Sequence, residues 1–284
     1  MIKFVFFDIG DVLFDENAQH LWLFHDLLLT LRSHGKDVLW DDFNDTRKRL
    51  TAAGPNPEAA IKGTLAFYCA NDSETEVLWH EARDLYQQMR KPRPYGQLLD
   101  GITPALEDLR QDFQLGIVAN QHPPVKEAIE GYGIAGLFDV MVISEIVHLF
   151  KPDPAIFQAG LDQAGITGPE AVFVGDRADN DIGPAKAAGL RTVRFKRGIQ
   201  YTLFHPDDPA LTADETVTDV SELAAAVRRV ARGEDEEEWG GDAGGEARPE
   251  VEEDLFFAGQ GAAGDEDAGG GGNLRKSRPH PFRR

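Results

Sequence analysis

Three aspartates in this 284-residue chain have the residue type and the placement to bind a divalent cation. Asp8 follows the apolar run KFVFF, Asp176 follows the apolar run AVFVG, and Asp181 comes five residues after Asp176. Carboxylates that converge at strand ends repel one another unless a cation lies among them. Oxygen ligands with room for water and for a phosphate oxygen are typical of Mg²⁺ sites. Helix capping is the alternative role for Asp181 and for its neighbour Asp179, where it is fully plausible.

Lys151 could contribute positive charge to the same site. It follows a predicted strand and precedes a predicted helix, in the segment KPDPAIF. The formal net charge of −20 repels anionic substrates at long range, so a phosphate site needs a cation of its own. A single ammonium group here could supply that charge. The alternative is an ordinary surface lysine.

The elements that must position these residues alternate along the chain. Short apolar runs typical of buried parallel strands occupy residues 3–7, 115–118, 140–143, 171–174 and 192–195. Helical spacing of apolar residues occupies residues 103–112, 125–132, 154–164, 179–188 and 220–232. This alternation predicts an α/β fold, a Rossmann-like parallel sheet core with helices on both faces.

Residues 16–95 interrupt the alternation with four segments of helical spacing and no strand-like run. We interpret them as an all-helical cap domain inserted into a core of residues 1–15 and 96–232. Residues 233–284 hold 12 glycines and 14 acidic residues, with too little apolar surface to offset the entropy lost on ordering. We therefore expect a disordered C-terminal tail, for which the sequence indicates no particular protein partner.

The composition argues against several classes of protein. A net charge of −20 disfavours binding to nucleic acid or to an anionic membrane, because both need clustered Lys and Arg. No apolar run approaches the roughly 20 residues that span a bilayer, and the first residues lack the pattern of a signal peptide. The single cysteine, Cys69, excludes an internal disulfide and a multi-cysteine zinc site. We expect a cytoplasmic protein.

Four segments, in order, resemble the motifs of the haloacid dehalogenase superfamily: FVFFDIGDVLF, LGIVAN, KPDPAIF and FVGDRADNDIGPAKAAG. The similarity extends over residues 1–232 and is to members with a helical cap between the first and second motifs. It implies a Mg²⁺-dependent phosphatase that acts on small phosphorylated metabolites through an aspartyl-phosphate on Asp8. Lys151 is then the third-motif lysine. The implied metal ligands are Asp8, the backbone carbonyl of Gly10, Asp176 and Asp181.

Two positions depart from the pattern of the family's phosphatases. Gly10 stands where they usually carry a second aspartate, the general acid and base, whose help is worth about 10²–10⁴ in rate. Asp11 and His122 are candidate substitutes for that acid. Ala119 replaces the usual hydroxyl residue of the second motif, which leaves Asn120 and backbone N–H groups to bind the phosphate. These departures favour substrates with good leaving groups.

Two other functions fit part of the pattern. A 2-haloacid dehalogenase also lacks the second aspartate, but such enzymes need no metal, and this chain keeps Asp176 and Asp181. A non-catalytic or regulatory binding protein would explain the loss of side chains at both Gly10 and Ala119. A metal test separates the three functions. A phosphatase requires Mg²⁺, a dehalogenase remains active in EDTA, and a binding protein shows neither activity.

Overall fold

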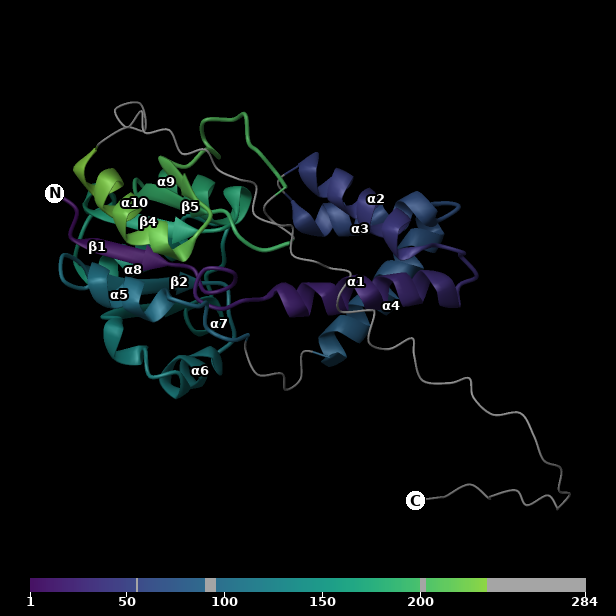
Figure 1. The fold of residues 1–284 in the computed structure, drawn as a ribbon, viewed down its shortest axis with the longest axis horizontal. Coiled ribbons are helices and arrows are strands. Elements are labelled where there is room, and N and C mark those ends of the chain that lie inside the picture. Colours follow the sequence, from purple (N-terminus) through teal and green to yellow (C-terminus); the bar gives the residue numbers. More distant parts are fainter. Residues whose placement is uncertain (55, 90–95, 200–202, 234–284) are drawn as a thin grey trace, which may run out of the picture. The chain divides into compact units, whose positions relative to one another are not determined.

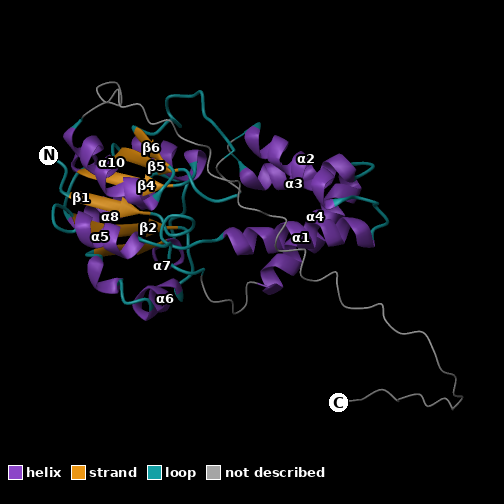
Figure 2. Ribbon diagram, in the orientation of Figure 1, coloured by secondary structure: helices purple, strands orange, loops and turns teal. Residues whose placement is uncertain are grey.

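A six-stranded parallel sheet organises the described part of the chain (Figure 1). The structure is a computed structural model that describes residues 1–54, 56–89, 96–199 and 203–233. The strands lie in the order β3-β2-β1-β4-β5-β6, and every neighbouring pair is parallel. Figure 2 shows β2, β1, β4, β5 and β6 in this order. Their bounds are β1 Phe4–Phe7, β2 Gln114–Ala119, β3 Val140–Ile143, β4 Ala171–Gly175, β5 Arg191–Phe195 and β6 Glu215–Val217. The predicted α/β fold is confirmed, and β6 is a strand that the sequence did not indicate.

The first strand lies in the middle of the sheet, between β2 and β4. All four residues of β1 are buried, because helices cover both faces of the sheet, and this is why the strand is an unbroken apolar run. Phe7 lies opposite Ile117 of β2 and Val174 of β4. The residues that follow these three strands therefore meet at one edge of the sheet, where ligands bind in open α/β folds.

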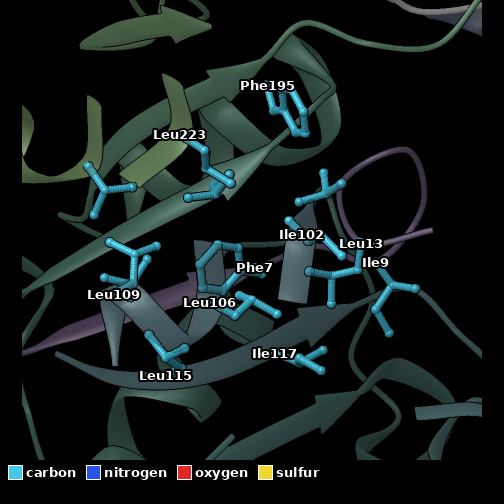
Figure 3. Packing of buried hydrophobic residues seen from close by; sticks show 14 of the residues in the cluster. Phe7, Ile9, Leu13, Ile102, Leu106, Leu109, Leu115, Ile117, Phe195 and Leu223 are labelled. Carbon is cyan, nitrogen blue, oxygen red and sulfur yellow. The ribbon is translucent and has the colours of Figure 1, made fainter. Parts of the chain in front are cut away.

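Helices cover both faces of the sheet, as predicted. Alternate residues of a strand point to opposite faces. Phe7 of β1 packs in a cluster with residues of α5, α6 and α10, part of which Figure 3 shows, whereas Phe6 packs in a second cluster with residues of α8 and α9. The helices of this part of the chain are α5 Ile102–Leu109, α6 Val125–Gly131, α7 Ser144–Val147, α8 Ala155–Ala164, α9 Gly183–Ala187 and α10 Val220–Arg232.

Between β1 and α5 the described residues form helices and no strand. Their apolar side chains build a core of their own, which includes Phe24. The Arg47 guanidinium is buried there, 4.1 Å from the centroid of the Phe24 ring. The predicted all-helical insertion is confirmed, whereas the domain boundaries 1–15, 16–95 and 96–232 stay predictions. The helices are α1 Asn17–Ser33, α2 Trp40–Ala52, α3 Pro57–Tyr68 and α4 Asp72–Met89.

The predicted C-terminal tail lies outside the described residues, apart from its first residue, Gly233. That glycine ends α10: its φ is +77°, and its N–H donates to the carbonyls of Arg229 and Val230. None of the described helices is long and apolar enough to cross a membrane.

Candidate active site

The three aspartates singled out in the sequence converge at the carboxyl edge of the sheet. Asp8 follows β1, Asp176 follows β4, and Asp181 lies in the π-helical turn Ala178–Ile182. One carboxylate oxygen of each lies within 4.8 Å of the others. Asp176 and Asp181 are buried and Asp8 is partly exposed, so solvent reaches the group from the side of Asp8.

Lys151 lies between two of these carboxylates. Its Nζ donates to Asp8 Oδ1 at 2.6 Å and to Asp181 Oδ1 at 2.6 Å, and its side chain is 1% exposed. Burial alone would lower the pKa of Lys151, but the ion pairs with Asp181 and Asp8 outweigh burial, and the pKa is raised. The ammonium group is therefore charged and reduces the repulsion between the two carboxylates.

The three carboxyl groups differ in their affinity for a proton. Burial raises the pKa of Asp8 to about 6, although Lys151 opposes the shift. Burial also disfavours ionisation of Asp181, but Lys151 and the N–H of Arg177, which donates to Asp181 Oδ2 at 3.0 Å, hold its pKa below the ordinary value. Burial, with Asp181 and Asp8 close by, raises the pKa of Asp176 well above the ordinary value. Asp176 is thus the member of the group that most needs a further positive charge.

The donor set fits a hard cation. Three carboxylates lie close together, and two of them pair with the Lys151 ammonium group. Asp176 Oδ2 is buried with no hydrogen-bond partner among the described residues. An unpartnered carboxylate oxygen is costly to bury unless a proton or a cation lies beside it. All the side-chain donors are oxygens, which is the ligand type that Mg²⁺ prefers.

Asn120 holds the backbone of Lys151 in place. Its Oδ1 accepts the N–H of Lys151 at 2.8 Å, and its Nδ2 donates to the Lys151 carbonyl at 2.9 Å. The two bonds join the loop after β2 to the segment before α8, 31 residues further along the chain. Phosphate binding by Asn120 stays a prediction, and the positioning of Lys151 is a role that the sequence did not indicate.

The structure places the two candidate acids outside the carboxylate group. Asp11 is fully buried, and its Oδ1 accepts the N–H of Glu16 at 3.0 Å. Burial raises the pKa of Asp11 to about 6. His122 is exposed, and its Nδ1 contacts a carboxylate oxygen of Glu145. Among the described residues, neither Asp11 nor His122 forms a hydrogen bond or an ion pair with the three carboxylates, so their roles in proton transfer stay predictions.

Arg194 of β5 is a charged residue of the site that the sequence analysis did not single out. It is buried; its Nε donates to the backbone carbonyl of Asp176 at 3.0 Å, and its Nη1 donates to the carbonyl of Phe204 at 3.0 Å. The guanidinium group thus holds the turn that carries Asp176. The sequence of the strand, RTVRF, could have indicated this role, because an arginine at an inward-facing strand position requires hydrogen-bond acceptors nearby.

A cavity of about 980 Å³ lies beside the first turns of α1 and α10, where Trp22, Leu99, Arg197 and Val220 are among its lining residues. The three carboxylates and Lys151 do not line it. The candidate active site is therefore identified by its converging charged groups and not by this cavity.

Known proteins similar to this chain include hydrolases of one family. A family model described as haloacid dehalogenase-like hydrolase matches residues 2–189. A phosphoserine phosphatase of Thermus thermophilus is 32% identical over 181 residues, which cover 63% of this chain and 62% of that enzyme, less than two thirds of its length. A glyceraldehyde 3-phosphate phosphatase of Methanopyrus kandleri is 31% identical over 190 residues, which cover 66% of this chain and 72% of that enzyme.

The fold is also found among solved structures. The crystal structure of a HAD-superfamily hydrolase, subfamily IA, from Geobacter sulfurreducens aligns with a TM-score of 0.52 and 21% identity. The alignment covers 80% of this chain and 96% of that one, and at this identity the likeness is one of fold alone. With the family match over residues 2–189, the conclusion is that this chain belongs to the haloacid dehalogenase-like hydrolase family.

Proposed function

We propose that this chain is a Mg²⁺-dependent phosphatase that acts on a small phosphorylated metabolite through an aspartyl-phosphate on Asp8. The observation that carries the proposal is the group of Asp8, Asp176 and Asp181 at the carboxyl edge of the sheet, where Lys151 pairs with Asp8 and Asp181. Phosphoryl transfer depends on positioning and on neutralisation of charge. The two relatives that are named phosphatases support the substrate class.

Asp8 is the nucleophile of the proposed reaction. Its carboxylate oxygen attacks phosphorus, the bond from phosphorus to the leaving oxygen breaks, and water then hydrolyses the aspartyl-phosphate. The Lys151 ammonium group, 2.6 Å from Asp8 Oδ1, orients the nucleophile and offsets charge on the transferring group. Mg²⁺, when bound, supplies further positive charge to the phosphate oxygens. The residues that would hold it are Asp8, Asp176, Asp181 and the backbone carbonyl of Gly10.

The substrate range depends on how the leaving oxygen obtains a proton. Gly10 offers no side chain two residues after the nucleophile, which favours good leaving groups unless another carboxyl group transfers the proton. The net charge of −20 argues against nucleic acid and anionic membranes as binding partners. A cytoplasmic location stays a prediction.

A phosphate-release screen over sugar, nucleotide and acyl phosphates tests this function. We expect turnover that requires Mg²⁺, stops in EDTA and is lost in Asp8→Asn. Asp162→Asn, at an exposed position of α8, is the matched control and should leave turnover unchanged. Turnover that persists in Asp8→Asn would refute the nucleophile. Activity on 2-haloacids in EDTA would favour a dehalogenase, and Mg²⁺ binding without turnover would favour a binding protein.

A further inference from the structure

The carboxylate of Glu16 lies against Gly10, the residue two positions after the nucleophile. A Cβ atom added to Gly10 would lie 2.8 Å from Glu16 Oε2, 2.9 Å from Glu16 Cδ and 3.1 Å from Glu16 Oε1. The carboxylate of Glu16 therefore occupies the space into which a side chain at position 10 would extend. We propose that Glu16 is a catalytic residue of this chain: it is the general acid for the leaving group and the general base for the attacking water. The assignment rests on the phosphatase function proposed above.

The loop after β1 brings Glu16 back to Gly10. The N–H of Phe14 donates to the carbonyl of Ile9 at 3.0 Å, so the chain reverses directly after the nucleophile. A β-bridge then joins Gly10 to Phe14. Asp11 Oδ1 accepts the N–H of Glu16 at 3.0 Å, which fixes the backbone from which the Glu16 side chain extends. Asp11 thus serves as a positioning residue for Glu16.

The position suits a group that exchanges protons with a substrate at Asp8. The Cα atoms of residues two apart lie at most about 7 Å from each other. The Glu16 carboxylate, which lies against Gly10, is therefore close to the backbone of the nucleophile. Glu16 is only partly buried, so solvent reaches its side chain.

One carboxyl group can serve both steps of the reaction. In the first step an Asp8 oxygen bonds to phosphorus, the bond to the leaving oxygen breaks, and protonated Glu16 gives that oxygen its proton. In the second step the Glu16 carboxylate takes a proton from water while the water oxygen bonds to phosphorus and the bond from phosphorus to Asp8 breaks. Glu16 ends protonated and Asp8 ends ionised, as at the start. Phosphate esters of aliphatic alcohols, whose leaving oxygen needs this proton, then fall within the substrate range.

Two aryl phosphates and the variant Glu16→Gln test the assignment. p-Nitrophenolate leaves readily without a proton, whereas phenolate, whose conjugate acid has a pKa of about 10, benefits from one. In the variant we expect kcat/KM for phenyl phosphate to fall about 100-fold or more, and kcat/KM for p-nitrophenyl phosphate to fall less than about tenfold. We also expect a burst of about one p-nitrophenolate per enzyme, because the second step has lost its base and the aspartyl-phosphate accumulates.

Two further variants separate chemistry from structure. Asp15→Asn removes a carboxylate from the adjacent position and from an ion pair with Arg197. It is the matched control and should show neither the burst nor the new dependence on leaving group. In a Glu16→Ala background, Gly10→Asp returns a carboxylate to the same space and should raise phenyl phosphate turnover at least about tenfold.

The outcomes distinguish this assignment from the proposed function. Equal losses on the two aryl phosphates, or no loss on either, would overturn the role of Glu16 and leave Asp8 as the nucleophile. Wild-type protein with no Asp8-dependent turnover would overturn the proposed function and the role of Glu16 with it. If circular dichroism shows that Glu16→Gln is unfolded, the double variant decides, and its failure to exceed Glu16→Ala would overturn the assignment.

Discussion

Replacing Lys151 by methionine keeps the length of the side chain and removes the ammonium group between Asp8 and Asp181. Both carboxylates lie 2.6 Å from Nζ, and the lysine side chain is 1% exposed. Removing one partner of a buried ion pair costs about 3–5 kcal/mol, because the remaining charge has no counter-ion. For a domain of this size each kcal/mol shifts the Tm by about 2–4 °C, so we expect a loss of about 6–20 °C.

The decrease in Tm caused by Lys151→Met should depend on pH. Without the ammonium group the pKa of Asp8, already about 6, rises further above the value in the unfolded chain. A carboxyl group whose pKa is raised by folding favours the folded state at low pH, and that contribution is lost as pH rises through the folded pKa. The Tm difference between wild type and Lys151→Met should therefore be larger at pH 8 than at pH 5. Thermal unfolding followed by circular dichroism in EDTA measures it.

Lys62→Met is the matched control for this variant. Lys62 Nζ also lies 2.6 Å from a carboxylate oxygen, Glu76 Oε1, but both side chains are exposed, by 38% and 51%. Water screens an exposed pair, so this variant should lower the Tm far less and equally at both pH values. If Lys151→Met and Lys62→Met lose the same amount at pH 8, the buried ammonium group does not hold the two carboxylates together, and the reasoning is refuted.

Three further variants test contacts around the site and in α1. Asn120→Ala leaves the N–H and the carbonyl of Lys151 without their side-chain partner. The free energy of unfolding, measured by urea denaturation, should fall by about 2–4 kcal/mol. In turnover assays kcat should fall by a larger factor than KM rises. Arg194→Met removes the donor to the Asp176 carbonyl and should lower the free energy of unfolding by about 2–4 kcal/mol in the same assay. Arg194→Lys should lower it by a smaller amount, because lysine keeps the charge but not the planar guanidinium group. Burial lowers the pKa of His20 to about 4, so the folded protein keeps it neutral while the unfolded chain binds a proton below about 6.5. The folded protein therefore loses stability as pH falls. The free energy of unfolding of wild type, relative to that of His20→Gln, should drop by about 3 kcal/mol from pH 7 to pH 4. If the difference between the two proteins is the same at both pH values, the lowered pKa of His20 is contradicted.

The strands could be predicted from the sequence because burial on both faces leaves a plain signal. The residues of β1 and β4 are all buried, and both strands read as unbroken apolar runs. The short strand β6 gave no such signal, because it has three residues and begins with Glu215, whose carboxylate pairs with Arg229 of α10. The strand ends then located Asp8 and Asp176, since parallel strands bring their carboxyl ends to one edge.

Contacts made by side chains and by loops could not be predicted in the same way. The hydrogen bonds of Asn120 to Lys151 cross 31 residues of sequence, and nothing in local spacing indicates them. Residues 179–188, predicted as one helix, begin instead with a π-helical turn at Ala178–Ile182, followed by α9. There the N–H of Ile182 donates to the carbonyl of Arg177, and the wider turn accompanies the ion pair of Asp181 with Lys151. The tertiary contact accounts for this departure from local helical preference.

The central place of β1 has a consequence for the chain while it is being synthesised. The strand is made before both of its partners, which begin at Gln114 and Ala171. At about 5–20 residues per second, roughly 110 residues of synthesis take about 6–22 s, and β4 comes later still. Throughout that time FVFF is an unpaired, strand-forming apolar segment of the kind that associates between nascent chains.

Charged residues on both sides of this segment limit such association. Lys3 precedes the strand and Asp8 follows it, and flanking charges oppose edge-to-edge pairing of apolar strands. We therefore expect Asp8→Asn to aggregate at a lower concentration than wild type during refolding, as measured by light scattering. Asp8, the proposed nucleophile, would then also reduce aggregation of the newly made chain.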